Sequence, residues 1–311
     1  MCNYHTLGSN FLQYKRFLGY KYKTDEVVIK EIVKYLENNN INIITKEIVE
    51  DYARINSNLS PNTIARNMGV FREFCKYLKL QKVEAYQIPN GIYTRNPNNY
   101  IPYIFSKNEM KKIYNNLNSV LNSPRYNYYR KTIYPLIIKI LYQTGMRIGE
   151  VLSLKINDYD IENGILYIKD PKNNMERLIC LPKNIIVELN HYINKFNYLF
   201  NENNAIFNAK SAAIEKYFYK VLKEVDINRT NTGPRLHDLR HTFVVRRIEK
   251  YTKEQVDFNV MLPVLQAHLG HQSLSSLTYY FHMTEHILKD IREISKINLT
   301  ILVSIWSYNK T

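Results

Sequence analysis

A run of proline, asparagine and glycine divides this sequence into two parts. The residues that interrupt regular structure there are Pro89, Asn90, Gly91, Pro97, Asn98, Asn99 and Pro102. Such a stretch disfavours both helix and strand, and its length is typical of an interdomain linker. We therefore predict a first domain at residues 1–88, a linker at 89–102, a second domain at 103–298 and a tail at 299–311. A chain of 311 residues is long enough for two domains, each with a core of its own.

The first part has the pattern of a small all-α domain. Apolar residues recur with helical spacing in Phe11–Tyr22, in Val27–Leu36 and again after Thr45. The fourth predicted helix has the clearest start, because Ser60 is a good N-cap and Pro61 stands at the first helical position. Its apolar face carries Ile64, Met68, Phe71, Cys75 and Leu78.

The second part mixes helices with one β-hairpin. It begins with a capping box of Ser106 and Glu109, which Phe105 and Met110 flank as a hydrophobic staple. Strands are predicted at 165–169 and 177–181, because the turn between them has strong turn residues. Helices are predicted at Ile133–Thr144, through Leu154, at 183–199 and 211–225, from near His237, at 262–269 and 274–281, and from about Thr284. The fold class is therefore mainly α with a small β-hairpin or sheet.

The charge balance favours a polyanionic partner. The chain has 43 Lys and Arg against 28 Asp and Glu, a net charge of +15, and both parts are basic. Abundant Asn, Ile, Lys and Tyr are typical of AT-rich genomes, so some of the lysine can reflect genome composition. The basic residues off the apolar face of the fourth helix fit a solvated surface and a DNA contact equally well; they are Arg66, Lys76 and Lys79. An acidic lipid surface is the weaker alternative, because no strongly amphipathic basic helix is present.

Several other classes of protein are disfavoured. No segment approaches the roughly 18 consecutive apolar residues of a membrane span, and residues 1–10 lack the features of a secretory signal. Cys2, Cys75 and Cys180 are too far apart in the sequence for a disulfide framework or a CxxC metal pair. We therefore expect a reducing, cytoplasmic location, which would be the bacterial cytoplasm or nucleoid.

Four short segments carry the residues best suited to chemistry. They are Thr144–Glu150 with Arg147, the hairpin turn with Lys172, His237–His241 with Arg240, and Leu269–Ser273 with His271. Tyr280 follows His271 by nine residues. Each has an ordinary explanation when taken alone. Arg147 could be a surface cation, Lys172 a turn residue, His237 and Arg240 a structural pair, His271 a helix cap, and Tyr280 one of 27 tyrosines.

Together, these segments resemble the tyrosine recombinase (phage integrase) family. Arg147 lies in a T-G-x-R-x-x-E pattern, His237 and Arg240 in H-x-L-R, and His271 in L-G-H, with Tyr280 at the expected offset. The resemblance covers about residues 103–290 closely, and the N-terminal part in general character. It implies an N-terminal all-α core-binding (SAM-like) domain and a C-terminal α+β catalytic domain.

Two positions depart from the family pattern or are ambiguous. Many relatives have a glycine next to the hairpin lysine, whereas Lys172 lies in Pro-Lys-Asn-Asn, so Lys169 is the alternative candidate. Tyr279 precedes Tyr280, but the nine-residue spacing and the Tyr-Phe-His ending both select Tyr280.

The resemblance implies how these residues would act on a phosphodiester. Two arginines would hold the scissile phosphate, because a guanidinium is planar and stays charged. The tyrosine would attack phosphorus to give a 3′-phosphotyrosyl link and a free 5′-hydroxyl, so that no ATP is needed. The implied set is Arg147 and Arg240 on the phosphate, Tyr280 as nucleophile, Lys172 as general acid, His237 as acid/base and His271 as a further hydrogen-bond donor. From its position three residues after Arg147 on the same helix face, Glu150 is expected to orient that arginine or its neighbours rather than to react, and Asp238 and His241 are assigned to structure.

The resemblance also implies the partners. The partner would be double-stranded DNA with recombination core sites. The protein would bind a single site as a monomer or dimer and form a homotetramer on synapsed DNA, where strand exchange would proceed through a Holliday junction. The apolar tail from Leu299 to Trp306 either folds back on its own core or docks on a neighbouring protomer. No cofactor or metal is implied, because HExxH, Cys/His, P-loop and GxGxxG patterns are all missing from the sequence.

Two alternatives use the same sequence features. One is a type IB-like topoisomerase that nicks and reseals without exchange; the other is a catalytically silent DNA-binding accessory protein. Because helical sequence begins near residue 11, we expect no extra N-terminal domain for distal arm sites. This favours a simple-site enzyme, such as a mobile-element integrase, a resolvase or a chromosome-dimer recombinase.

Overall fold

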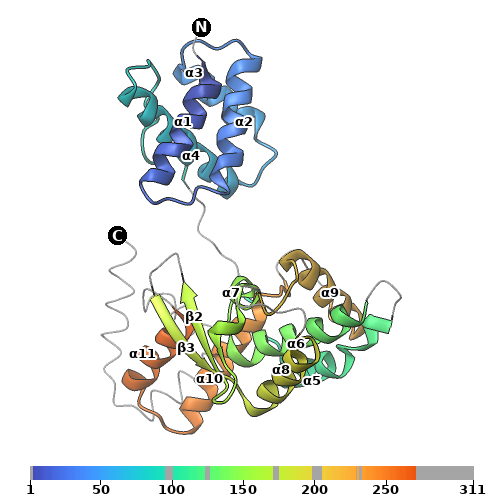
Figure 1. The fold of residues 1–311 in the computed structure, drawn as a ribbon. Coiled ribbons are helices and arrows are strands. Elements are labelled where there is room, and N and C mark those ends of the chain that lie inside the picture. The colour runs from blue at the N-terminus through green and yellow to red at the C-terminus, as the bar shows by residue number, and fades with distance from the viewer. Residues whose placement is uncertain are drawn as a thin grey trace. The chain divides into compact units, whose positions relative to one another are not determined.

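The computed structural model describes residues 3–94, 101–122, 127–170, 175–197, 205–228, 230 and 233–270. It divides into two compact units, Met1–Asn99 and Tyr100–Thr311, and the division falls inside the segment 89–102 (Figure 1). Each unit has hydrophobic clusters of its own. Within the described residues, no helix is both long and apolar enough to cross a membrane.

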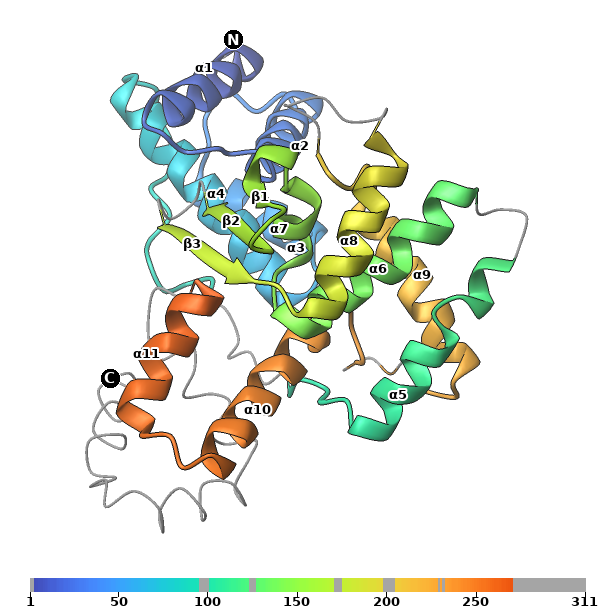
Figure 2. The same cartoon turned by 60° about the horizontal axis from the view of Figure 1, so that its bottom comes forward.

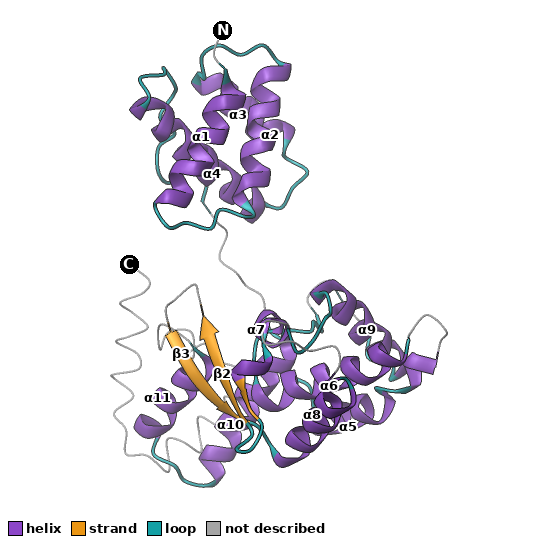
Figure 3. Ribbon diagram, viewed as in Figure 1, coloured by secondary structure: helices purple, strands orange, loops and turns teal. Residues whose placement is uncertain are grey.

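The N-terminal unit consists of helices, as Figure 3 shows. They are α1 (Tyr4–Phe17), α2 (Asp25–Asn38), α3 (Lys46–Ile55) and α4 (Pro61–Leu80). The Ser60 side chain accepts from the Thr63 amide, and Pro61 is the first helical residue of α4. The predicted apolar face of α4 lies in the core, where Met68, Phe71, Cys75 and Leu78 are buried. Both features of the fourth predicted helix are thus confirmed.

The first helix differs from the prediction of Phe11–Tyr22. It begins at Tyr4, because the Asn3 side chain caps the Thr6 amide and the buried Tyr4 hydroxyl donates to the Asn42 carbonyl at 3.0 Å. It ends at Phe17, because the backbone of Gly19 turns to a φ of +86°. The prediction used apolar spacing and overlooked this cap.

Two basic residues of α4 are held in ion pairs. Arg66 pairs with Asp25 of α2 at 2.8 Å, and Lys76 pairs with Glu73 on its own helix at 2.8 Å. Both are partly exposed, and pairs of this kind contribute little to stability. In this structure, Arg66 and Lys76 therefore form ion pairs on the surface of the N-terminal domain.

The second unit is α+β, with helices packed beside a small sheet (Figures 1 and 2). Its helices are α5 (Lys107–Asn116), α6 (Tyr128–Thr144), α7 (Ile148–Ser153), α8 (Lys183–Lys195), α9 (Ser211–Glu224), α10 (Asp238–Lys253) and α11 (Phe258–Leu269). Two short 3-10 turns are η1 (Ser119–Asn122) and η2 (Ile156–Asp158). The predicted capping box of Ser106 and Glu109 is present at the start of α5.

The sheet is antiparallel with the order β1-β2-β3, and its strands are β1 (Tyr159–Asp160), β2 (Ile165–Asp170) and β3 (Met175–Cys180). The predicted hairpin is confirmed as β2 and β3, whose register places Ile168 opposite Arg177 and Leu166 opposite Ile179. The short β1 was not predicted, because two residues are too few for an alternating pattern.

Helix α6 forms the centre of the larger core. It packs against α8, α9 and α10, and residues 136–138 are almost fully buried, in agreement with the prediction of a buried helix. A second cluster joins α10 and α11, and α11 also packs against β3. This arrangement brings the ends of α6, α10 and α11 together, and the candidate site lies there.

Candidate active site

Arg147 stands on a sharp turn between α6 and α7. Gly145 ends α6 in the left-handed conformation, with φ +67°. A Cβ atom at this position would lie 2.4 Å from the Phe243 ring, so the turn needs glycine for both its backbone and its space. The turn places Arg147 at the N-cap of α7. The Gly-x-Arg spacing of the motif thus has a local structural cause.

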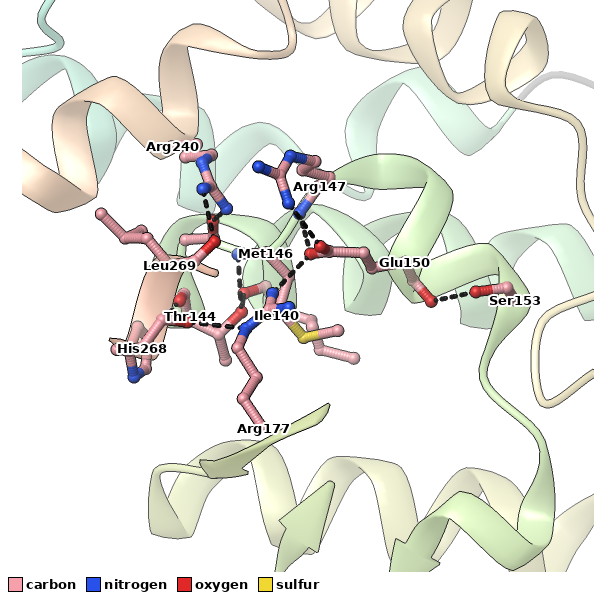
Figure 4. A network of polar contacts seen from close by, with 11 residues as sticks. Ile140, Thr144, Met146, Arg147, Glu150, Ser153, Arg177, Arg240, His268 and Leu269 are labelled. Atoms are coloured by element: carbon pink, nitrogen blue, oxygen red, sulfur yellow. Dashed lines mark hydrogen bonds and ion pairs between the residues drawn. The ribbon is translucent and has the colours of Figure 1, made fainter. Parts of the chain in front are cut away.

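Glu150 holds Arg147 through both its backbone and its side chain. The carboxylate accepts from the Arg147 amide at 2.8 Å and from Arg147 Nη1 at 2.8 Å. It also accepts from Arg177 Nη2 at 2.8 Å. Burial alone would raise the pKa of Glu150, but the hydrogen bonds and charges of Arg177 and Arg147 outweigh it and lower that pKa. Glu150 is therefore an anion that orients Arg147, as predicted (Figure 4).

The Arg147 guanidinium keeps donors for a ligand. Its side chain is 37% exposed, and Nη1 bonds Glu150. The other guanidinium N–H groups make no hydrogen bond within the described part of the chain. One nitrogen anchors the group, and the rest can point at an anion.

Arg240 of α10 is the second arginine, and it is 3% exposed. Its Nη1 donates to the Gly145 carbonyl at 2.7 Å, and its Nη2 donates to the Leu269 carbonyl at 2.8 Å. These bonds tie Arg240 to the turn that carries Arg147 and to the end of α11. Gly145 is two residues before Arg147, and the charges of Arg147 and Arg240 both act on His237; Figure 4 shows the bonds that hold the two arginines. Two cations from segments about 90 residues apart in the sequence therefore converge.

His237 precedes α10 and lies within the field of both arginines. The His237 residue keeps an exposed face, but partial loss of its hydration lowers its pKa to about 4, and the positive charges of Arg240, Arg235 and Arg147 act in the same direction. Its ring meets that of His241 edge-on, with centroids 4.9 Å apart. His237 is therefore a neutral imidazole at pH 7.

Asp238 and His241 were assigned to structure, and the contacts of Asp238 agree. Its fully buried carboxylate accepts from the Arg235 amide at 2.7 Å, and the Arg235 guanidinium lies 3.7 Å away. This interaction closes the turn before α10 and places His237 at the helix start.

Three predicted site residues lie outside the described residues: Lys172, His271 and Tyr280. Tyr279 and the tail at 299–311 lie outside them as well. The alternative Lys169 is described, and its ammonium pairs with Asp158 at 3.2 Å. The structure therefore brings together Arg147, His237 and Arg240.

Two residues of this cluster were not predicted, Arg177 and His268. Arg177 pairs with Glu150, and the His268 ring bonds the Thr144 carbonyl at 2.8 Å and stacks on Phe243. Burial lowers the pKa of His268. A signal for Arg177 was available, because it occupies an inward position of β3 in line with buried Ile179. A cation on the buried side of an alternating strand needs a partner.

Among the described residues, no group of three or more His, Cys, Asp or Glu side chains could hold a metal ion. The cluster described above consists instead of arginines, the histidines His237 and His268, and the Glu150 carboxylate. Such a set suits an anion with several oxygens, since guanidinium groups match the geometry of phosphate.

Comparisons with known proteins agree with this geometry. The family model described as "Phage integrase family" matches residues 104–286. A putative integrase/recombinase of Sinorhizobium fredii is 24% identical over 304 residues, which are 93% of this chain and 96% of the relative. Tyrosine recombinase XerA of Pyrococcus furiosus is 30% identical over 160 residues, which are 51% of this chain and 53% of the relative.

Solved structures share the fold. The pre-cleavage complex of the XerH site-specific recombinase with difH substrate superposes with a TM-score of 0.63 at 22% identity, over 92% of this chain and 83% of that one. The Tn1549 transposon integrase in complex with transposon right end DNA gives 0.61 at 16% identity, over 94% and 99%. A mainly helical chain with a small sheet, as predicted, is thus confirmed.

Proposed function

This chain belongs to the phage integrase family of tyrosine recombinases, and we propose that it cuts and rejoins double-stranded DNA through a 3′-phosphotyrosyl intermediate. The observation that carries the proposal is the convergence of Arg147 and Arg240 beside a neutral His237, with Glu150 fixing one arginine. A phosphodiester repels nucleophiles through its own negative charge. Two fixed guanidinium groups offset that charge and stabilise the additional charge that develops in the transition state.

In the proposed step, the Tyr280 oxygen bonds to phosphorus as the bond from phosphorus to the 5′-oxygen breaks. His237 takes the phenolic proton, and Lys172 gives a proton to the departing 5′-oxygen. His271 donates a hydrogen bond to the phosphate. The phosphoester energy is kept in the phosphotyrosyl link, so the reverse attack by a 5′-hydroxyl rejoins the strand without ATP.

The partner in this proposal is duplex DNA. A net charge of +15 supports binding to phosphates along the DNA, and the XerH and Tn1549 structures named above contain DNA. The proposed assembly is a monomer or dimer on one site and a homotetramer on two synapsed sites. Exchange of the strands in pairs would pass through a Holliday junction.

The biological setting is part of the same proposal. Relatives named integrase/recombinase and a transposon integrase among the structural neighbours support a mobile element as this setting. The two described cysteines, Cys75 and Cys180, are free thiols, which fits a reducing compartment such as the bacterial cytoplasm.

The test begins with a duplex selected from a random pool by the full-length protein. A nick beside the cleavage point lets the short fragment leave, so that the covalent protein–DNA adduct accumulates. We expect an adduct with wild type and with Tyr279→Phe, and none with Tyr280→Phe. An adduct with Tyr280→Phe but not with Tyr279→Phe would show that the nucleophile is misassigned. No adduct from the wild type on its selected site would refute the enzymatic proposal in favour of an accessory protein.

A second assay separates recombination from topoisomerase activity. Supercoiled plasmids carry no, one or two copies of the selected site. A recombinase gives exchanged products that require two copies, whereas a type IB-like topoisomerase relaxes the plasmids without exchange.

A further inference from the structure

Arg177 is a buried cation that links its own strand to two other segments. It lies on β3, and its side chain is 8% exposed. Nη2 donates to Glu150 on α7 at 2.8 Å, and Nε donates to the His268 carbonyl at the end of α11, also at 2.8 Å. Two bonds from one rigid, planar group therefore fix the distance between α7, α11 and the hairpin.

The bond to Glu150 matters for Arg147. One carboxylate oxygen of Glu150 accepts from both the Arg147 amide and Arg177 Nη2, and the other accepts from Arg147 Nη1. Without Arg177, the carboxylate would keep its two hydrogen bonds to Arg147 but lose the bond that ties it to β3. Its single negative charge would then fall on Arg147 alone. Arg177 thus sets both the orientation of Arg147 and the share of its charge that stays available to a phosphate.

The end of α11 is bonded to the same cluster in three places. The His268 carbonyl accepts from Arg177, the Leu269 carbonyl accepts from Arg240, and the His268 ring bonds Thr144, next to the turn that carries Arg147. The chain leaves α11 through Gly270, whose φ is +63°. A Cβ atom on Gly270 would lie 2.9 Å from Arg177 Nη1. Residue 270 therefore has to be small for the guanidinium to lie where it does.

We propose that Arg177 is a positioning residue for DNA strand cleavage, which holds Arg147 through Glu150 and keeps the end of α11 in register with both site arginines. This inference rests on the proposed function for its link to cleavage. It also makes a structural claim that is testable without DNA.

The variants are Arg177→Met, which removes both bonds, and Arg177→Lys, which keeps a charge for Glu150. Arg246→Met is the matched control. Arg246 also bonds one carboxylate, Glu249 at 2.7 Å, and one carbonyl, Phe105 at 3.0 Å, and it is 26% exposed. These bonds involve neither Glu150 nor the site arginines. The loss of Arg246 shows what removal of a partly buried arginine does to cleavage when the site arginines are not involved.

The first readout is the single-turnover rate of adduct formation on the nicked duplex, at protein concentrations that saturate binding. We expect Arg177→Met to lower this rate about 100-fold, a loss typical of a misplaced catalytic group, while site affinity changes little. Arg177→Lys should fall in between, and Arg246→Met should cleave like wild type. Equal rates in Arg177→Met and wild type, or equal losses in Arg177→Met and Arg246→Met, would overturn the proposal. Thermal unfolding verifies that each variant is folded. If Arg177→Met does not fold, the comparison is made with Arg177→Lys instead.

The second readout tests the path through Glu150. If Arg177 acts through that carboxylate, the double variant Glu150→Gln/Arg177→Met should cleave only slightly more slowly than the more severe single variant. Both substitutions would then disrupt the same interaction, so their effects on the rate would not add. If the rate loss of the double variant equals the product of the two single losses, the two residues act independently, which contradicts the proposal.

The third readout is NMR of the arginine guanidinium groups in the free protein. Rotation of the Arg147 guanidinium should be faster in Arg177→Met than in wild type and in Arg246→Met. Unchanged rotation would refute the positioning role even in a protein that cleaves no DNA. A wild type that forms no adduct would therefore count against the proposed function, while the NMR comparison still decides this inference.

Discussion

Gly145→Ala should destabilise the catalytic unit through both its backbone conformation and a steric clash. The left-handed conformation at φ +67° costs a residue with a Cβ about 1 kcal/mol. The new methyl group would also lie 2.4 Å from the Phe243 ring. That ring is 5% exposed, and it stacks on His268 with centroids 5.3 Å apart, so it has little room to move away. Overpacking of this kind costs about 1–3 kcal/mol.

The two effects sum to about 2–4 kcal/mol. Urea unfolding followed by hydrogen exchange in peptides from α6 and α10 measures this loss in the catalytic unit by itself. Two other glycines separate the causes. Gly149 has an ordinary φ, and a Cβ added there would meet no atom within 4 Å, so Gly149→Ala should be neutral or slightly stabilising. Gly19 has φ +86° in open space, so Gly19→Ala should show the backbone cost alone, in peptides from α1.

The double variant Gly145→Ala/Phe243→Leu tests the ring contact directly. A smaller side chain at 243 should recover part of the loss, giving a coupling energy of about 1 kcal/mol. The reasoning fails if Gly145→Ala costs no more than Gly19→Ala, or if the double variant shows no coupling. Arg240 bonds the Gly145 carbonyl, so a displacement of the backbone at residue 145 should also move Arg240 and slow adduct formation.

Three further predictions concern other parts of the site and fold. The pKa of His237 is about 4 in the folded chain against 6.5 when unperturbed; the unfolded state therefore binds the proton first, and stability should fall as pH drops from 6.5 towards 4. His237→Gln should flatten that slope in urea midpoints measured across this range, and an unchanged slope would contradict it. Gly270→Ala should displace Arg177 and lower the adduct rate at saturating protein; a normal rate would show that the guanidinium adapts. Ser106→Ala should cost about 1 kcal/mol in unfolding free energy, because it opens the capping box with Glu109, and no loss would mean that the box is not formed in solution.

Elements whose signals lie close together in the sequence were predicted correctly. The cap at Ser60, the capping box at Ser106 and the hairpin around 165–180 all depend on residues within a few positions of one another. These signals were sufficient to predict those elements. The first helix was misplaced, because its start depends on a cap at Asn3 and on the contact between Tyr4 and Asn42, 38 residues further along the chain.

In the candidate site, too, some residues were predictable from sequence motifs and others only from tertiary contacts. The motifs selected Arg147, His237 and Arg240 by their order and spacing, and Glu150 by its place three residues after Arg147. Arg177 belongs to none of those motifs, and its role became visible only in the bonds it makes to Glu150 on α7 and to the end of α11. Which partner a buried cation finds depends on elements that meet across 27 and 91 residues of sequence.

The amino-acid order by itself therefore determined the helices and strands with strong local signals, since helical and strand periodicity, caps and turns act over short stretches of backbone. It also predicted a division near residues 89–102 and selected Arg147, His237 and Arg240. Tertiary packing decided which charges share one carboxylate, why positions 145 and 270 need glycine, and how α11 is tied to both arginines. Those outcomes depend on the close packing of distant segments, where a buried charge is stable only beside the partner that folding supplies.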